Sequence, residues 1–262
     1  MHAFEYSAPA SVADAVAALN ADAKILAGGQ TLLPTMKQRL AAPATLIDLR
    51  KVAGLAGITR EGDSIVIGAM TPHAEVATSP VAAAIKGLAH LAGLIGDPAV
   101  RHRGTIGGSL ANNDPAADYP AAALALGAVI VTNKREIAAD AYFTGLFETA
   151  LEENEIITKV KFPIPEKSGY EKFRNPASRY AMVGVFVAKT SSGVRVAVTG
   201  AGSSGVFRQA EMETALAANF APDAIKSIKI DPDGMLSDLH GDADYRAHLV
   251  GVMARRAVAA AA

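Results

Sequence analysis

The order of apolar and polar positions separates the chain into three regions. In the first region, short apolar runs at residues 24–27 and 45–49 predict strands. Apolar positions at helical spacing predict one helix beginning at Val12 and another over residues 32–40. Ser11 favours a helix start, because its hydroxyl can accept a hydrogen bond from a free amide of the first turn. We therefore expect a small β-α-β unit at the N-terminus.

The middle region predicts more elements and one long irregular segment. We expect strands at residues 55–60, 64–69, 129–131 and 156–162, helices at 72–77 and 81–92, and an apolar helix leading into the strand at 129. Residues 96–119 are dense in Gly, Asn, Asp and Pro, and this composition predicts irregular structure. Because a loop of that length inside a compact domain is usually functional, the segment is a candidate site.

The third region starts near Pro163 and places strands before helices. Strands are expected at residues 170–174, 183–189 and 194–199, followed by helices at 207–218 and 245–261. A meander followed by helices is typical of a small α+β domain.

Composition narrows the possible functions. The 262 residues are 50 % apolar, which is enough for a sizeable core and excludes a mainly disordered chain. The absence of Cys excludes disulfides, thiolate zinc sites and Cys-ligated iron–sulfur clusters in this chain. A net charge of −1 and the absence of Trp give no support to nucleic-acid binding or to an anionic membrane surface. The six His show no metal-ligand spacing, so no metal site is expected.

No segment of the sequence has the pattern of a membrane span or a signal peptide. The longest apolar run, residues 121–131, is shorter than the roughly 20 residues that a helical span needs. The N-terminus lacks a basic segment followed by an apolar one. These patterns predict a soluble cytoplasmic protein.

The first glycine motif is Ala-Gly-Gly-Gln-Thr-Leu-Leu at residues 27–33, between a predicted strand and a predicted helix. Paired glycines let backbone amides point outward and let a ligand approach without a Cβ in the way. The positive end of the helix dipole would favour a phosphate there. The alternative is a plain turn followed by a helix start, and residues 27–33 alone leave both open.

The second glycine motif is Arg-Gly-Thr-Ile-Gly-Gly-Ser-Leu-Ala-Asn at residues 103–112. The Thr105 and Ser109 hydroxyls and the exposed amides would donate hydrogen bonds to further phosphate oxygens. Asp118 stands where a helix N-cap is expected, and its carboxylate could accept hydrogen bonds from sugar or ribityl hydroxyls. Alternatively, Asp114 and Asp118 only cap turns and the next helix. Two such loops in one chain fit a diphosphate-bearing cofactor better than a single phosphate.

Five segments, in order along nearly the whole chain, carry a resemblance to a known family: residues 27–34, 103–112, 114–120, 170–174 and 241–257. With these segments the chain resembles the FAD-binding medium subunit of the molybdenum hydroxylases, the family of xanthine dehydrogenase and aerobic carbon monoxide dehydrogenase. The resemblance implies an α+β fold of the vanillyl-alcohol-oxidase (PCMH) type. Its two FAD-binding subdomains would be residues 1–50 and 51–165, followed by a C-terminal flavoprotein domain at 166–262.

The resemblance also implies which residues bind FAD. The first loop and Thr105 to Ser109 would hold the pyrophosphate, Asp118 would bind FAD hydroxyls, and Tyr180 would lie close to the isoalloxazine. Gln30 stands where some relatives have His, and either side chain can donate a hydrogen bond. The full set implied is Lys24, Ala27, Gly28, Gly29, Gln30, Thr31, Leu32, Leu94, Ile95, Thr105, Ile106, Gly107, Gly108, Ser109, Asp114, Asp118, Ile157, Lys172 and Tyr180.

The resemblance further implies partners and an electron path. In this family a large molybdopterin subunit oxidises the substrate, two [2Fe–2S] clusters on a small subunit carry the electrons, and FAD passes them to NAD, quinone or oxygen. A chain without Cys agrees with a flavin subunit that depends on such partners. The resemblance implies that the subunits assemble as a dimer of heterotrimers. No side chain is assigned as a general base, because electron transfer needs distance and orientation rather than an activated group.

Two other functions stay open at this point. One is a stand-alone FAD oxidoreductase on the same fold, although no Ser, Cys or Glu stands out as a proton donor. The other is an assembly subunit that has lost FAD, although the intact glycine pairs and Asp118 argue against it.

Overall fold

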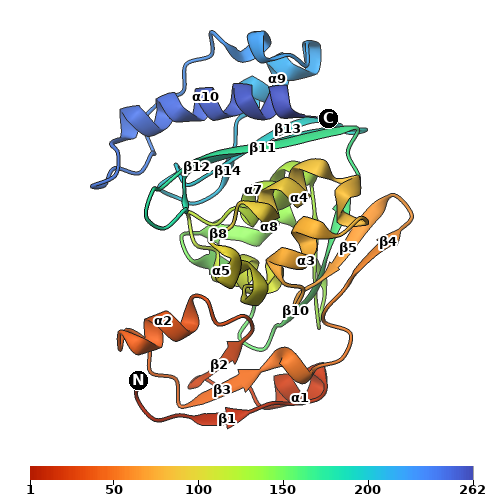
Figure 1. The fold of residues 1–262 in the computed structure, drawn as a ribbon, viewed down its shortest axis with the longest axis vertical. Coiled ribbons are helices and arrows are strands. Elements are labelled where there is room, and N and C mark those ends of the chain that lie inside the picture. Colours follow the sequence, from red (N-terminus) through yellow and green to blue (C-terminus); the bar gives the residue numbers. More distant parts are fainter. Residues whose placement is uncertain (262) are drawn as a thin grey trace.

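The computed structural model describes residues 1–261 and contains three larger sheets stacked along the long axis of the molecule (Figure 1). The N-terminal sheet is parallel, with strand order β1-β3-β2. Its elements are β1 (Glu5–Ser7), α1 (Val12–Ala17), β2 (Ala23–Leu26), α2 (Leu32–Lys37), β3 (Thr45–Asp48) and a 3₁₀ turn, η1 (Leu49–Lys51). The predicted N-cap is confirmed, since the Ser11 hydroxyl accepts a hydrogen bond from the Asp14 amide at 3.1 Å.

The middle sheet is antiparallel, with strand order β4-β5-β10-β6-β7. Its strands are β4 (Ile58–Glu61), β5 (Ser64–Gly68), β6 (Val129–Thr132), β7 (Glu136–Ala138) and β10 (Ile157–Pro163). The helices beside it are α3 (His73–Thr78), η2 (Ala82–Ala84), α4 (Lys86–Gly93), α5 (Pro98–Arg103), α6 (Ile106–Asn112), α7 (Tyr119–Leu126) and α8 (Ala139–Tyr142). A small hairpin, β8 (Phe143–Gly145) and β9 (Glu148–Thr149), follows α8.

The prediction of irregular structure at residues 96–119 is wrong for most of this segment, because the segment contains α5 and α6. Each helix begins at a side-chain cap: the Asp97 carboxylate accepts from the Val100 amide at 2.9 Å, and the Thr105 hydroxyl accepts from the Gly108 amide at 3.2 Å. Pro98 follows Asp97 at the first helical position, where proline is well tolerated. Capping and packing therefore stabilise two short helices whose composition resembles that of a loop.

Two other expected helices have different bounds. The helix expected at 81–92 is divided into η2 and α4, because Ile85 has φ −117° and ψ 83°, outside the helical region. The helix expected from residue 207 starts at 210, because Phe207 and Arg208 pair with the neighbouring strand instead.

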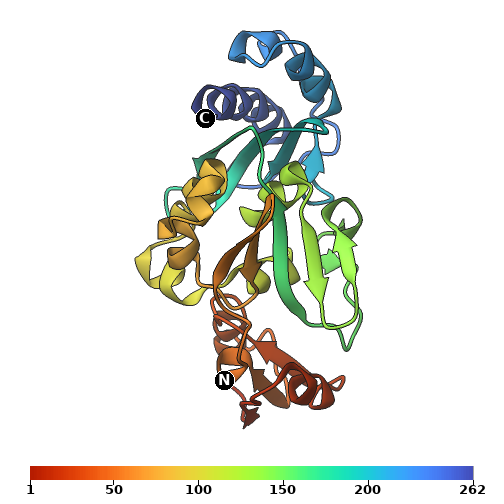
Figure 2. The ribbon, with the colours of Figure 1, turned by 90° about the vertical axis from the view of Figure 1, so that its right-hand side faces the viewer.

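The C-terminal sheet is antiparallel and covered on both faces (Figure 2). Its elements are β11 (Lys167–Arg174), β12 (Ala181–Thr190), β13 (Gly193–Thr199), β14 (Phe207–Arg208), α9 (Ala210–Ala218), η3 (Pro222–Ile225) and α10 (Ala243–Ala260). Alternate residues of β12 face opposite sides, as strand geometry requires. Val185 and Val187 pack with α9 and α10, whereas Phe186 and Ala188 pack into the core of the middle sheet.

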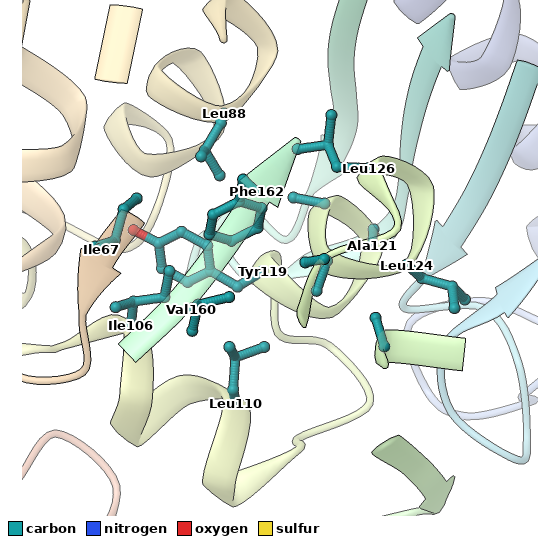
Figure 3. Packing of buried hydrophobic residues seen from close by; sticks show 14 of the residues in the cluster. Ile67, Leu88, Ile106, Leu110, Tyr119, Ala121, Leu124, Leu126, Val160 and Phe162 are labelled. Carbon is teal, nitrogen blue, oxygen red and sulfur yellow. The ribbon is translucent and has the colours of Figure 1, made fainter. Parts of the chain in front are cut away.

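The largest core cluster lies around α7, in which every residue is buried (Figure 3). The Tyr119 and Phe162 rings lie beside Leu88, Ile106 and Leu110 in this view. Because Tyr170 and Phe186 of the C-terminal sheet belong to the same cluster, that sheet and the middle sheet share one core. None of the helices described between residues 1 and 261 has the length and hydrophobicity that a bilayer crossing requires.

Candidate cofactor-binding site

A cavity of about 630 Å³ is lined by residues of the N-terminal and middle sheets, by both glycine loops and by the loop between β11 and β12. Its volume is in the range of small-molecule sites, roughly 300–1,000 Å³. The predicted site residues that line it are Lys24, Ala27, Gly28, Gly29, Gln30, Thr31, Leu32, Ile95, Thr105, Gly107, Gly108, Ser109, Asp114, Asp118, Ile157 and Tyr180. Three predicted residues do not line it. Ile106 is fully buried in the core, Leu94 packs against that core, and Lys172 is buried beside Asp118.

The first glycine loop lines the cavity and has backbone amides without an acceptor in the described chain. Gly29 has φ +72°, a left-handed conformation that glycine adopts without strain. After this turn, the amides of Gln30, Thr31 and Leu32 have no hydrogen-bond acceptor within residues 1–261. The Thr31 side chain caps none of them. Three adjacent free amides beside a cavity are suited to an anionic group such as a phosphate.

The two glycine loops touch each other through Gly28. A Cβ at this position would lie 2.1 Å from the carbonyl oxygen of Arg103 and 2.7 Å from the Cα of Gly104. The missing side chain of Gly28 therefore makes room for the second loop rather than for a ligand. This contact brings together two segments that are far apart in the sequence.

The second loop offers hydroxyls to the cavity, and the expectation of several exposed amides there is wrong. The Ile106 and Gly107 amides donate to the carbonyls of Thr71 and Ala69, at 3.3 and 2.9 Å. The Gly108 amide donates to the Thr105 hydroxyl, and the Ser109 amide donates to the Thr105 carbonyl. The Ser109 side chain forms no hydrogen bond within the described part of the chain, so its hydroxyl is available to a ligand.

Asp118 stands before α7 as expected, but its side chain does not act as an N-cap. Its φ and ψ are helical and its side chain caps no amide of α7. Instead, Oδ1 accepts a 2.5 Å hydrogen bond from the Tyr170 hydroxyl and lies 2.8 Å from the Lys172 ammonium nitrogen. Burial raises the pKa of the Asp118 carboxyl, and the Lys172 charge and the Tyr170 hydroxyl oppose that rise. The carboxyl is thus fixed by two residues of β11.

The loop between β11 and β12 lies beside the cavity and carries Tyr180. This side chain is half exposed, and burial raises the pKa of its hydroxyl, with the Asp114 and Asp118 carboxyls adding to the rise. Neighbouring Arg179 has φ +63°. Asp114 accepts a 2.9 Å hydrogen bond from the Ala116 amide, so its carboxyl does cap a turn, as the alternative interpretation expected.

Several lining residues were not predicted, and His73 and Asn112 are the most polar of those near the second loop. His73 is 5 % exposed, and its ring lies 5.3 Å from that of Tyr119. Burial and then the charge of Arg101 lower the pKa of His73 to about 4, so the imidazole is neutral near pH 7. No local pattern marks His73, because its place depends on the pairing of Pro72 with Thr105. Asn112 could have been included from its position in the second motif.

These residues fit a dinucleotide that carries ring systems and a diphosphate. The free amides of the first loop and the Ser109 hydroxyl provide donors for phosphate oxygens. Apolar side chains line the cavity from the N-terminal β-α-β unit, such as Leu19 and Ile25, and from other parts, such as Ile95 and Val100. In the described residues no three His, Asp or Glu side chains are grouped in a way that could hold a metal ion.

Comparison with known proteins agrees with this geometry. The family described as "FAD binding domain in molybdopterin dehydrogenase" matches residues 2–165. The carbon monoxide dehydrogenase medium chain of Hydrogenophaga pseudoflava is 39 % identical, over 98 % of this chain and 96 % of that protein. The nicotine 6-hydroxylase medium subunit of Paenarthrobacter nicotinovorans is 37 % identical, over 98 % and 96 %.

A solved structure with a similar fold is a reconstituted CO dehydrogenase from Oligotropha carboxidovorans. It superimposes with a TM-score of 0.88 at 34 % identity, over 99 % of this chain and 97 % of that chain. The family match covers more than half of the chain, and the relatives are matched over nearly their full length. The chain belongs to the family of FAD-binding medium subunits of the molybdenum hydroxylases, which are oxidoreductase subunits, and its cofactor is FAD.

Proposed function

We propose that this chain is the flavin subunit of a multi-subunit molybdenum hydroxylase. It takes electrons from [2Fe–2S] clusters on a small partner subunit and passes them to an external acceptor, which is NAD, quinone or oxygen. The observation that carries the proposal is the row of free amides in the first glycine loop, beside a cavity lined by the second loop. FAD supplies the redox chemistry when bound, and the chain supplies its position.

The proposed roles of the side chains follow from what each can donate or accept. The amides of Gln30, Thr31 and Leu32 and the Ser109 hydroxyl bind the pyrophosphate, because each is a donor on a lining residue and has no acceptor within residues 1–261. Asp118 accepts hydrogen bonds from FAD hydroxyls through its carboxyl. Tyr180 lies against the isoalloxazine and limits its contact with water.

The proposed partners are a large molybdopterin subunit and a small [2Fe–2S] subunit, assembled as a dimer of heterotrimers. This chain has no Cys with which to ligate a cluster, so a [2Fe–2S] cluster that supplies electrons lies on another chain. Relatives named for carbon monoxide and for nicotine are almost equally similar to this chain, at 39 % and 37 % identity. We therefore assign the choice of substrate to the large subunit rather than to this one.

The cofactor assignment is tested by reconstitution. The purified chain is mixed with FAD, and flavin absorbance after gel filtration and the thermal unfolding midpoint are measured. FAD at 100 to 1,000 times its Kd is expected to stabilise the fold by about 3–4 kcal/mol. Riboflavin is the control ligand, because it lacks the diphosphate and is expected to stabilise far less. A chain that retains no flavin and shows no shift would contradict the proposal.

The electron path is tested by the composition of the native complex. The chain is purified under mild conditions from its source, and iron, molybdenum and flavin are determined in the same fraction. Stoichiometric iron and molybdenum are expected. If the flavin-loaded chain purifies without them, the stand-alone FAD oxidoreductase becomes the better assignment.

A further inference from the structure

Asp118 and Lys172 form a buried pair, and the Tyr170 hydroxyl also contacts Asp118. The proposed function assigns no role to this hydroxyl. Tyr170 and Lys172 are two residues apart on β11, so both side chains leave the same face of the strand. Both reach the same oxygen of Asp118, Oδ1. Oδ2 accepts no hydrogen bond from residues 1–261, and Asp118 lines the cavity.

The two contacts to Oδ1 differ in direction. Lys172 lies 2.8 Å away, but its ammonium group forms no correctly angled hydrogen bond with any acceptor in the described chain. Lys172 therefore supplies charge without fixing an angle. The Tyr170 hydroxyl forms a hydrogen bond of 2.5 Å to the same oxygen and so restricts the rotation of the carboxyl group. A buried carboxylate needs both kinds of partner, a counter-charge and a directional donor.

The neighbouring strand leaves room for this hydroxyl. A Cβ at Gly184 in β12 would lie 2.4 Å from the Tyr170 hydroxyl oxygen. The Tyr170 side chain is fully buried, and its ring lies 6.1 Å from that of Phe186. The ring is thus held by the core, and the absence of a side chain at Gly184 accommodates its polar end.

We propose that Tyr170 is a positioning residue for the cofactor: it holds Asp118 Oδ1 so that Oδ2 faces the cavity and accepts a hydrogen bond from an FAD hydroxyl. This inference rests on the proposed contact between Asp118 and FAD. It assigns to β11 a part in binding the cofactor, although neither Tyr170 nor Lys172 lines the cavity.

The test is the FAD affinity of Tyr170→Phe, measured by titration of flavin fluorescence. The variant keeps the ring in the core and removes the hydroxyl. The Kd for FAD is expected to rise about tenfold or more, as for the loss of one hydrogen bond to a charged group. Tyr142→Phe is the matched control. Tyr142 is also fully buried, and its hydroxyl donates to the Leu110 carbonyl at 3.2 Å without contact to Asp118.

The pH dependence of the Kd separates positioning from a general loss of stability. Tyr170 donates to the ionised form of the carboxyl, so its removal is expected to shift the loss of FAD affinity in acid to higher pH than in the wild type. Equal Kd values and equal pH profiles for Tyr170→Phe and Tyr142→Phe would overturn the inference. If Tyr170→Phe does not fold, Gly184→Ala replaces it, since its Cβ displaces the hydroxyl. A wild-type chain that binds no FAD would instead contradict the proposed function.

Discussion

At the scale of single residues, His73 is a buried group whose protonation is coupled to folding. Burial and the nearby charge of Arg101 lower its pKa to about 4, against an ordinary value of 6.5. Its Nδ1 atom has no hydrogen-bond partner in the described chain. The folded protein therefore keeps this imidazole neutral at pH values where the unfolded chain would protonate it.

This difference predicts how stability depends on pH. Between about pH 6.5 and pH 4 the unfolded state binds a proton that the folded state does not, so the free energy of unfolding falls as the pH falls. The full difference corresponds to about 3 kcal/mol, and it is lost once the pH reaches about 4. Urea unfolding of the wild type and of His73→Gln at several pH values in this window checks it. A variant with the same slope as the wild type would show that His73 is not the group responsible.

At the scale of elements, the C-terminal sheet fixes the loop that carries the candidate site. The Thr199 hydroxyl at the end of β13 lies 3.0 Å from the Pro115 carbonyl oxygen and 2.7 Å from that of Ala117. The Gly200 amide also donates to the Pro115 carbonyl, at 2.8 Å. Together with the contacts of β11 to Asp118, these bonds attach residues 115–118 to a sheet formed much later in the sequence.

Thr199→Val is expected to loosen this loop. The substitution keeps the shape of the side chain and removes the hydroxyl. The buried Ala117 carbonyl then loses this donor, whereas the Pro115 carbonyl keeps the Gly200 amide. A decrease of about 1–3 kcal/mol in the free energy of unfolding is expected, with weaker FAD binding. Thr214→Val is the control, since Thr214 is exposed on helix α9 and donates only to the Ala210 carbonyl of its own helix. Equal effects of the two substitutions in urea unfolding and FAD titration would contradict this role.

Elements with a clear apolar period could be predicted from the sequence. The strands near 157–163, 181–190 and 193–199 are present close to their expected bounds, and α7 is the apolar helix expected before the strand at 129. Helices α5 and α6 could not be predicted in this way, because each is under two full turns and depends on a cap and on packing. The short strand β14 forms only where β13 offers a partner, which no local pattern reveals.

The candidate site, too, could be predicted from the sequence only in part. Both glycine loops could be recognised locally, because a loop rich in glycine is visible in the sequence itself. The contact of Gly28 with Arg103 and the contact of Tyr170 with Asp118 depend on segments that meet only in the folded chain. For the same reason the lining position of His73 was not foreseen.

At the scale of the whole molecule, the site depends on residues beyond the matched FAD-binding region, 2–165. Tyr170, Lys172 and Thr199 hold the Asp118 segment, and the inner face of the C-terminal sheet completes the core around α7. Without that sheet, the Asp118 carboxyl loses its partners and an apolar face of α4 and α7 is exposed to water.

A fragment of residues 1–165 is therefore expected to bind no FAD at concentrations that saturate the full chain, and to associate through the exposed apolar face. Fluorescence titration and gel filtration of the fragment and the full chain measure both effects. Addition of a separate fragment of residues 166–262 is expected to restore some binding. A fragment that binds FAD as tightly as the full chain would show that the C-terminal sheet is dispensable.

The partners of Asp118 also determine when the site can be completed during synthesis. A ribosome adds residues from the N-terminus, and N-terminal parts of a chain generally fold first. Asp118 is made before Tyr170, Lys172 and Thr199, so the growing chain has both glycine loops before it can fix this carboxyl. Asp118 and its segment can therefore gain these partners only after β11 and β13 have been translated.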